Sequence, residues 1–153
     1  MKITKIITVI LAVSFLCANS HAEFAKRSAE IVDMEGTGQV IAPNMPAVPA
    51  EVGMVLTEGY VVKTGAESWI MFNLVSDQEP ADVEMKENTE MFFSELLLDA
   101  QEGVQKTLLD LAIGEILITS KKLQSEKSKF EVKTPTSIIG VRGTSFSVSV
   151  EAE

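Results

Sequence analysis

The fold class is decided by residues 130–150, which read FEVKTPTSIIGVRGTSFSVSV. Residues 130–134 and residues 145–150 both alternate apolar or β-branched side chains with polar ones. A period of two is typical of a β-strand with one buried and one solvated face. Pro135 ends the first run, because proline lacks the N–H that a strand would donate. We therefore expect two strands joined by a loop.

The rest of the chain has the same character, with short apolar runs bounded by Gly, Pro, Asn or Asp. Residues 68–75 are apolar on both faces, which predicts a strand in the middle of the core. Residues 91–98 fit either a strand or a short helix, because their large apolar side chains also recur at helical spacing. The earlier strands are expected at residues 39–42, 54–56, 60–63, 68–75, 82–86, 90–98, 106–113 and 116–119. About ten short strands predict an all-β single domain, built as a β-sandwich, a roll or a short β-solenoid.

Residues 1–22 are typical of a secretory signal peptide. Two lysines precede the apolar run Ile6–Leu16, which is too short to span a membrane, and small residues precede Glu23. We expect cleavage before Glu23, a lead-in at residues 23–35 and a β domain at residues 36–153. The alternatives are lipid attachment at Cys17, which the bulky residues before it disfavour, and an uncleaved N-terminal anchor. No later segment is long and apolar enough for a membrane span, so the sequence predicts a periplasmic or secreted domain.

The residue types left after cleavage exclude most catalytic chemistry. The only cysteine is Cys17 and the only histidine is His21, so the mature chain would lack both. This excludes disulfide frameworks, thiol nucleophiles, Ser-His-Asp triads and the common His or Cys zinc sites. No Ser-x-x-Lys sequence occurs either. We expect no enzymatic activity, no metal and no cofactor.

The charge is acidic and unevenly distributed. Without the two leader lysines the chain has 11 basic and 22 acidic residues, a net charge of −11. Residues 23–120 carry 5 basic and 18 acidic side chains, whereas residues 121–153 carry 6 basic and 4 acidic ones. Nucleic-acid binding is therefore not expected, because it needs clustered Lys and Arg. The acidic run at residues 77–102 has no calcium-loop spacing and is interpreted as a solvated face.

The closing stretch resembles the end of the FecR domain, in which a strand ends at Thr-Pro and a Val-Arg-Gly-Thr-x-Phe-x-Val turn and strand follow. The matching residues are Thr134, Pro135, Gly140, Val141, Arg142, Gly143, Thr144, Phe146 and Val148. A looser pattern of glycines and apolar residues extends the resemblance to residues 36–150. Tyr60 stands where family members often carry Asp, and residues 76–80 replace an Asp-Gly turn, so these loops are expected to serve a different partner.

The resemblance implies a module that acts by binding. FecR-type regulators hold a sigma factor in the cytoplasm, cross the membrane once and present this domain in the periplasm to an outer-membrane transporter. Here a signal peptide takes the place of the cytoplasmic segment, so we expect a stand-alone secreted domain without the sigma-regulator and transmembrane segments. The predicted function is non-enzymatic binding or sensing, by docking on another cell-envelope protein. The alternative is a glycan-binding module acting on peptidoglycan. Sugar-binding surfaces usually need exposed aromatic side chains, and Tyr60 and Trp69 are the only Tyr and Trp of the chain.

Four residues of the closing stretch are the candidates for partner binding: Ser137, Ile138, Ile139 and Arg142. Arg142 either binds a partner carboxylate or locks the final turn through an internal one. The two isoleucines would form an interface if they are exposed and core if they are buried. The structural part of the motif is expected to comprise Thr134, Pro135, Gly140, Gly143, Thr144 and Phe146, with the two glycines at tight bends or close approaches.

Overall fold

A computed structural model describes residues 24–75, 80–121 and 125–151. Within these ranges no helix is long and apolar enough to cross a membrane. The strands are β1 (Phe24–Lys26), β2 (Ala29–Glu35), β3 (Gly38–Ile41), β4 (Val48–Pro49), β5 (Val55–Leu56), β6 (Val61–Thr64), β7 (Trp69–Leu74), β8 (Ala81–Met85), β9 (Glu90–Asp99), β10 (Val104–Ser120), β11 (Lys129–Lys133), β12 (Ile138–Val141) and β13 (Thr144–Val150).

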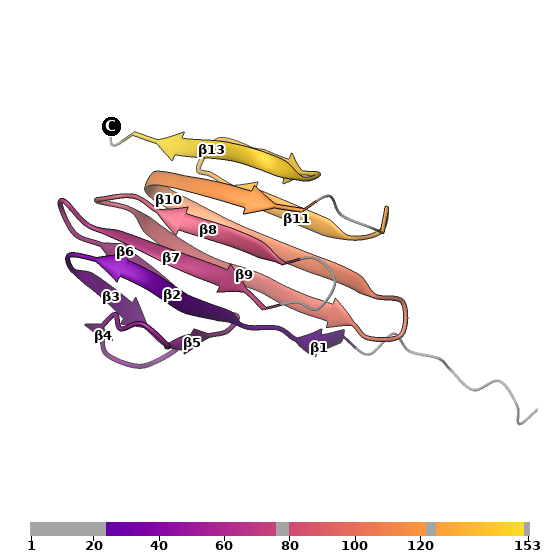
Figure 1. Cartoon of the computed structure of the whole chain (residues 1–153), viewed down its shortest axis with the longest axis horizontal. Helices are drawn as coiled ribbons and strands as arrows, with labels where there is room; N and C mark the ends of the chain where they lie inside the picture. The colour runs from indigo at the N-terminus through magenta and orange to yellow at the C-terminus, as the bar shows by residue number, and fades with distance from the viewer. Residues whose placement is uncertain (1–23, 76–79, 122–124, 152–153) are drawn as a thin grey trace, which may run out of the picture.

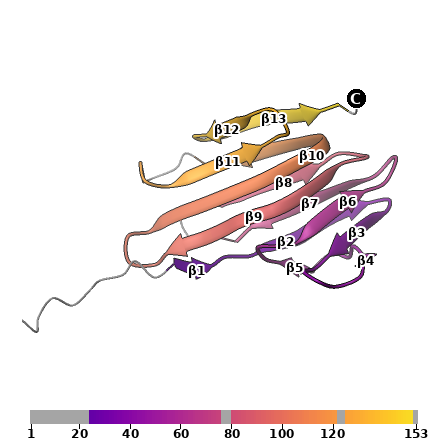
Figure 2. The same cartoon turned by 180° about the vertical axis from the view of Figure 1, so that it is seen from behind.

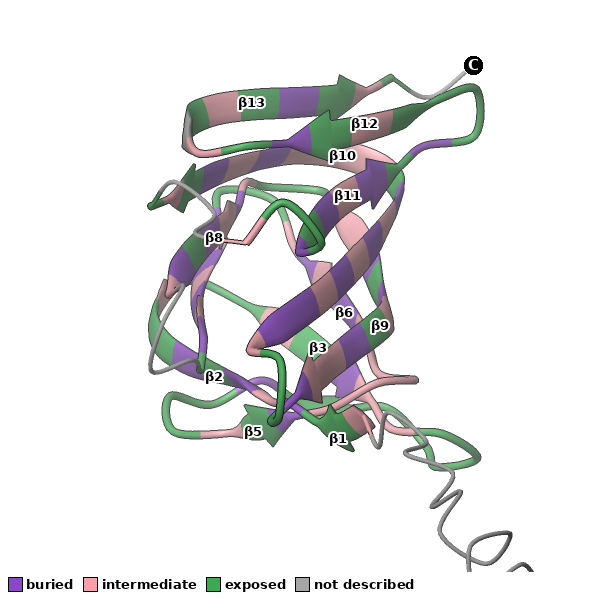
Figure 3. Ribbon diagram, turned by 90° about the vertical axis from the view of Figure 1, so that its right-hand side faces the viewer, coloured by how far each residue is buried: buried purple, intermediate pink, exposed green. Residues whose placement is uncertain are grey.

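The strands form one curled sheet, a half-barrel, in the order β4-β3-β6-β9-β10-β8-β7-β2-β5 (Figures 1 and 3). The first half of β10 pairs with β9 and β11, and its second half pairs with β8 and β13. β10 therefore belongs to two layers: a β9 layer (β4, β3, β6, β9, β1, β11 and β12) and a β8 layer (β5, β2, β7, β8 and β13). All pairings are antiparallel except that of β10 with β11. The expected all-β single domain is confirmed.

β10 passes between the layers at a glycine. Gly114 has a φ of +93°, which glycine adopts without strain. The Thr89 hydroxyl lies against Gly114 and accepts a hydrogen bond of 3.0 Å from the Glu115 N–H. The sequence predicted two strands here, broken at Gly114, and that prediction is wrong. The glycine bends one strand of 17 residues instead of ending it.

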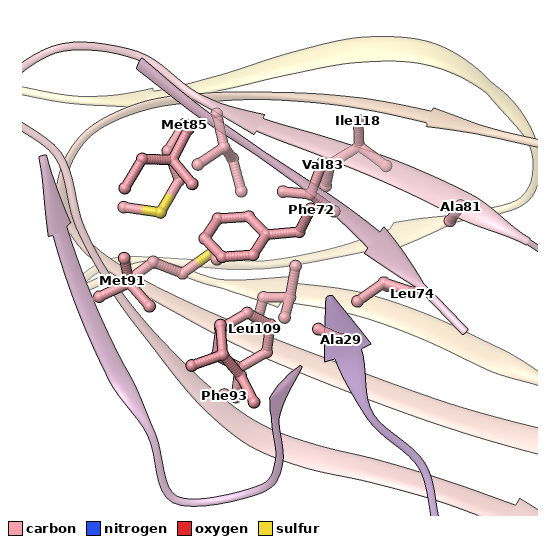
Figure 4. Close-up of a cluster of buried hydrophobic side chains, with 14 of the residues drawn as sticks. Ala29, Phe72, Leu74, Ala81, Val83, Met85, Met91, Phe93, Leu109 and Ile118 are labelled. Carbon is pink, nitrogen blue, oxygen red and sulfur yellow. The ribbon is translucent and has the colours of Figure 1, made fainter. Parts of the chain in front are cut away.

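The core lies between the two layers. Phe72 on β7 and Phe93 on β9 meet edge to face, with ring centroids 5.5 Å apart, and both are fully buried (Figure 4). On β7, Ile70, Phe72 and Leu74 are buried, but Trp69 and Met71 on the other face are only half-buried. The prediction that both faces of this strand are buried is wrong, because the outer face of a single-walled sheet borders solvent.

β9 is a strand throughout, so the helical alternative for residues 91–98 is wrong. Its pairing with β10 shifts between Leu108 and Leu109, whose partners are Glu95 and Phe93. Ser94 is therefore an extra residue, a β-bulge. The bulge separates the buried residues Phe93 and Leu96 by three positions instead of two, and this spacing imitates a helix.

The segment expected as a lead-in contributes to the sheet. β1 pairs with the end of β9, and β2 lies between β7 and β5. Ala29 and Ile31 of β2 are fully buried in the core. The folded unit therefore starts before residue 36.

Candidate functional site

The candidate residues lie on and beside a β-hairpin formed by β11 and β12. β11 runs parallel to the first half of β10, and β12 pairs antiparallel with β11, so that Val132 faces Ile139. Among the described strands β12 has no second partner, and its outer edge is unpaired. Residues 138–139 were expected in a loop, and that expectation is wrong. They begin an edge strand.

The turn between β11 and β12 is closed by Thr134. The Thr134 N–H donates to the Ser137 carbonyl at 2.8 Å, and the Ser137 N–H donates to the Thr134 hydroxyl at 3.1 Å. Thr134 is buried, whereas Pro135 and Ser137 are exposed. The strand therefore ends at Thr134-Pro135, as expected, and the Thr134 hydroxyl accepts a hydrogen bond within the turn that follows.

The two isoleucines of β12 point to opposite faces. Ile139 is half-buried and packs against the core, and Val141 on the same face is buried. Ile138 lies on the other face, with 67% of its surface exposed. A strand places successive side chains on opposite faces, so only one of the two could be core. The structure assigns the core position to Ile139 and the exposed position to Ile138.

Arg142 follows β12 and is exposed. It forms no hydrogen bond or ion pair with any described residue. Of the two roles considered for Arg142, the lock on the final turn therefore finds no carboxylate among the described residues. With Lys129, Gly140 and Glu131 it lines a hollow of about 280 Å³. Lys127, two residues before Lys129, binds Glu102 instead of a residue of this hollow. Its 2.5 Å hydrogen bond to Glu102, and then the charge of that carboxylate, raise the pKa of Lys127.

The glycines of the motif differ in their surroundings. Gly143, between β12 and β13, has a φ of +90° and makes the bend that the sequence predicts. Gly140 lies in β12, and a Cβ there would meet nothing within 4 Å. The expectation that Gly140 marks a tight bend or a close approach is therefore wrong. Phe146 on β13 packs partly buried against the core.

β13 is a second edge strand, and it follows β12 in the chain. It has seven residues, pairs only with β10 among the described strands, and contains no charged residue and no proline. Ser145, Ser147 and Ser149 on its outer face are exposed. By contrast β4 and β5 have two residues each, and β4 includes Pro49. Short strands and proline are common protections of sheet edges, and β13 has neither.

Comparison with known proteins assigns the chain to a family. The model of a family described as FecR protein matches residues 55–153, more than half of the chain. The protein belongs to the FecR family. No curated protein and no solved structure matches it. The FecR family is regulatory and non-enzymatic, and FecR domains are typically periplasmic. The match includes β11, β12 and β13, so the candidate residues lie inside the family domain.

The two aromatic residues of the glycan alternative line different surface hollows in this FecR-family protein. Trp69 lines a hollow with Glu67 and Lys86, and its indole N–H donates to Glu35 at 3.3 Å. Tyr60 lines a different, apolar hollow beside β3 and β5. Within the described ranges, no group of three or more His, Cys, Asp or Glu side chains is placed to hold a metal ion.

Sequence reasoning missed the apolar hollow that contains Tyr60. Its signal was the run of apolar side chains in the proline-rich segment 43–55, where a solvated loop would carry polar residues. The segment lies between the strands expected at residues 39–42 and 54–56, and the sequence assigned it no binding role. The hollow also needs β3 and β5, which belong to different layers, and the sequence does not predict that these two strands lie close together.

Proposed function

We propose that this FecR-family protein is a periplasmic binding or sensing module that docks on another protein of the cell envelope through its C-terminal edge. The docking edge consists of β12, Arg142 and β13. The observation that carries the proposal is that Ile138 and Arg142 are both exposed, and that Arg142 has no hydrogen-bond or ion-pair partner among the described residues. Both lie at strand edges that no described strand covers.

Each part of the docking edge has a binding role. An extended segment of a partner can pair with an edge strand as an additional strand. Its affinity then comes from main-chain hydrogen bonds to the unpaired N–H and C=O groups of the edge. Ile138 would fill an apolar pocket of the partner, and Arg142 would bind a carboxylate through two parallel hydrogen bonds. Arginine is enriched among the few interface residues that carry most of the binding energy.

Charge supports an acidic partner at this edge. Residues 121–153 carry a net charge of +2, although the whole chain carries −9. Lys127 and Lys133 are paired with Glu102 and Asp110, so the charge that an acidic partner would meet at the docking edge is that of Arg142. The partner segment is therefore expected to be extended and acidic, with a pocket for Ile138.

The test is crosslinking in living cells. A photoreactive residue at Ser137 should trap one envelope protein, to be identified by mass spectrometry, whereas the same residue at exposed Val32 on β2 should not. Adding Arg142→Ala or Ile138→Ser should lower the yield of the Ser137 adduct at least about fivefold, because each variant removes one of the two anchors of the interface.

Two results would count against docking. The first is a Ser137 adduct that forms equally in Arg142→Ala and Ile138→Ser, since it would then reflect chance collision. The second is the absence of any adduct together with a shift of Trp69 fluorescence on adding peptidoglycan fragments, which would favour the glycan alternative.

A further inference from the structure

The end of the half-barrel opposite the docking edge carries an apolar hollow of about 290 Å³. β3, β5 and the loop that bears β4 surround it. Figures 1 and 2 place β4 and β5 on the side of the sheet away from β12 and β13. The lining includes Val40, Met45, Met54, Leu56 and Tyr60. Apart from the Tyr60 hydroxyl, these side chains are apolar.

Exposed apolar side chains extend the hollow into a patch. Met45 is 62% exposed and Val55 is 58% exposed, and both line the hollow. Val48 also lines it, and Val52 lies close by in the chain, each exposed as well. Contiguous exposed apolar surface on a soluble domain marks a binding site. Met45 adds an adaptable side chain of the kind that such surfaces use.

The surroundings of this patch are acidic. Residues 29–62 include five acidic side chains and no Lys, Arg or His. Lys63, which lines a neighbouring hollow with Val48, is held by an ion pair with Glu90. Three of the carboxylates lie next to the patch: Glu30 pairs in register with Val55, Glu51 precedes Val52, and Glu58 lies between Leu56 and Tyr60. None of the three forms an ion pair with another described residue. The patch therefore presents apolar surface bordered by negative charge.

Size and charge together select the ligand. Sites for small molecules usually measure about 300–1,000 Å³, so this hollow is at the lower limit and suits one or two side chains. Anionic lipid surfaces would be repelled by the three carboxylates. We propose that the hollow is a second docking site, which binds a polypeptide segment that carries a large apolar side chain flanked by Lys or Arg.

This site is independent of the docking edge in residues, charge and ligand. With both sites occupied, the domain would connect an acidic partner at one end to a basic partner at the other. A loss of binding at one end is therefore distinguishable from a loss at the other, and Arg142→Ala should leave the second site intact.

The experiment uses the full chain and the acetylated, amidated peptide Gly-Lys-Leu-Phe-Lys-Gly as the probe. Nitrogen-15 NMR spectra should show shifts at Met45, Val55 and Tyr60 on addition of this peptide. Replacing both lysines of the peptide by Glu should weaken binding at least about tenfold, because it puts like charges together. Replacing Leu-Phe by Ser-Ser should weaken it by a similar factor, because the apolar contact is lost.

Val55→Asp is the deciding variant, since Val55 is exposed and its replacement leaves the core untouched. It should abolish the shifts. Val75→Asp is the matched control, because Val75 is also exposed, at 45%, and lies outside the hollow. It should bind the peptide as the unmodified chain does. Glu51→Lys with Glu58→Lys should reverse the preference between the lysine and glutamate peptides.

Three results would overturn the proposal. Equal binding of the lysine and glutamate peptides would remove the charge argument, and unchanged binding in Val55→Asp would place the peptide elsewhere. The third result is that the peptide never binds, while Val55→Asp abolishes binding to phosphatidylglycerol vesicles or turns a dimer into a monomer. The occupant would then be a membrane or a second copy of the chain.

Discussion

Gly114 is the residue on which the bend of β10 depends. A Cβ at this position would lie 2.5 Å from the Thr89 Cα, and the φ of +93° disfavours any L-residue. Gly114→Ala therefore adds backbone strain of about 1–2 kcal/mol and an overpacking cost of about 1–3 kcal/mol. We expect the thermal midpoint, measured by circular dichroism, to fall by about 10 °C.

Gly140→Ala is the control for this substitution, because Gly140 has open space around it. Its midpoint should change by no more than about 2 °C. Gly53→Ala separates the two causes, since Gly53 has a φ of +88° with nothing within 4 Å. It should fall between the other two variants. Equal midpoints for Gly114→Ala and Gly53→Ala would show that contact with Thr89 adds nothing.

Two arginines of this chain contrast in what they contact. Arg27 is only 7% exposed, and its guanidinium donates to the Thr107 hydroxyl at 3.0 Å. Arg142 is exposed and contacts no described carboxylate. Arg27→Ala leaves a buried acceptor and a void, so it should lower the stability by about 2–4 kcal/mol. Arg142→Ala should change it by no more than about 0.5 kcal/mol.

Urea unfolding of the two variants, followed by circular dichroism, measures both values. The same removal of a guanidinium then separates a structural arginine from one that is free to bind a partner. A loss in Arg142→Ala as large as that in Arg27→Ala would mean that Arg142 locks the final turn, and the docking edge would lose its charged anchor.

At the scale of elements, the sequence predicted those strands in which apolar and polar side chains alternate, because one face lies in the core and the other in solvent. β11 and β13 were found in this way, because each has one face in the core and one in solvent. β9 was ambiguous because the bulge at Ser94 breaks the period of two. β10 was divided because a glycine interrupts a pattern whether it ends a strand or bends one. Local patterns do not contain the pairing that distinguishes these cases.

The candidate site was predictable in part. The closing motif located Ser137, Ile138, Ile139 and Arg142, and these residues do lie together on or beside one strand. Which isoleucine is exposed follows from the register of β12 on β11, which residues 138–141 alone do not specify. The apolar hollow was not predictable, because β3 and β5 belong to different layers, which come together only when the sheet curls.

We expect this protein to self-associate through β13 when no partner covers the docking edge. A seven-residue edge strand without charge or proline can pair with another copy during heating. Ser149→Lys places a charge on this strand opposite Glu115, its cross-strand neighbour. We expect aggregation, followed by light scattering, to begin about 5 °C higher than in the unmodified chain, because edge lysines oppose strand addition.

Gln101→Lys is the control for this variant, because it adds the same charge at an exposed turn position away from β13. It should leave the onset of aggregation within about 1 °C of the unmodified chain, if the edge and not net charge decides it. An equal delay in both variants would assign the effect to net charge.

At the scale of the whole molecule, β10 joins the two layers into one cooperative unit. Leu109 in its first half and Ile116 in its second half are both fully buried in the same core cluster. A strand that belongs to both layers cannot leave one of them without disturbing the other. Domains of this size with one core usually unfold in a single transition.

Trp69 makes this testable, because the only tryptophan of the chain lies on β7 in the β8 layer. Its fluorescence should follow the same urea curve as circular dichroism, which reports both layers. Leu109→Ala and Ile116→Ala should each cost about 2–5 kcal/mol. Each should move both curves together. If Leu109→Ala shifted circular dichroism and left the Trp69 curve in place, the β8 layer would be stable by itself, and the two binding ends would belong to separable units.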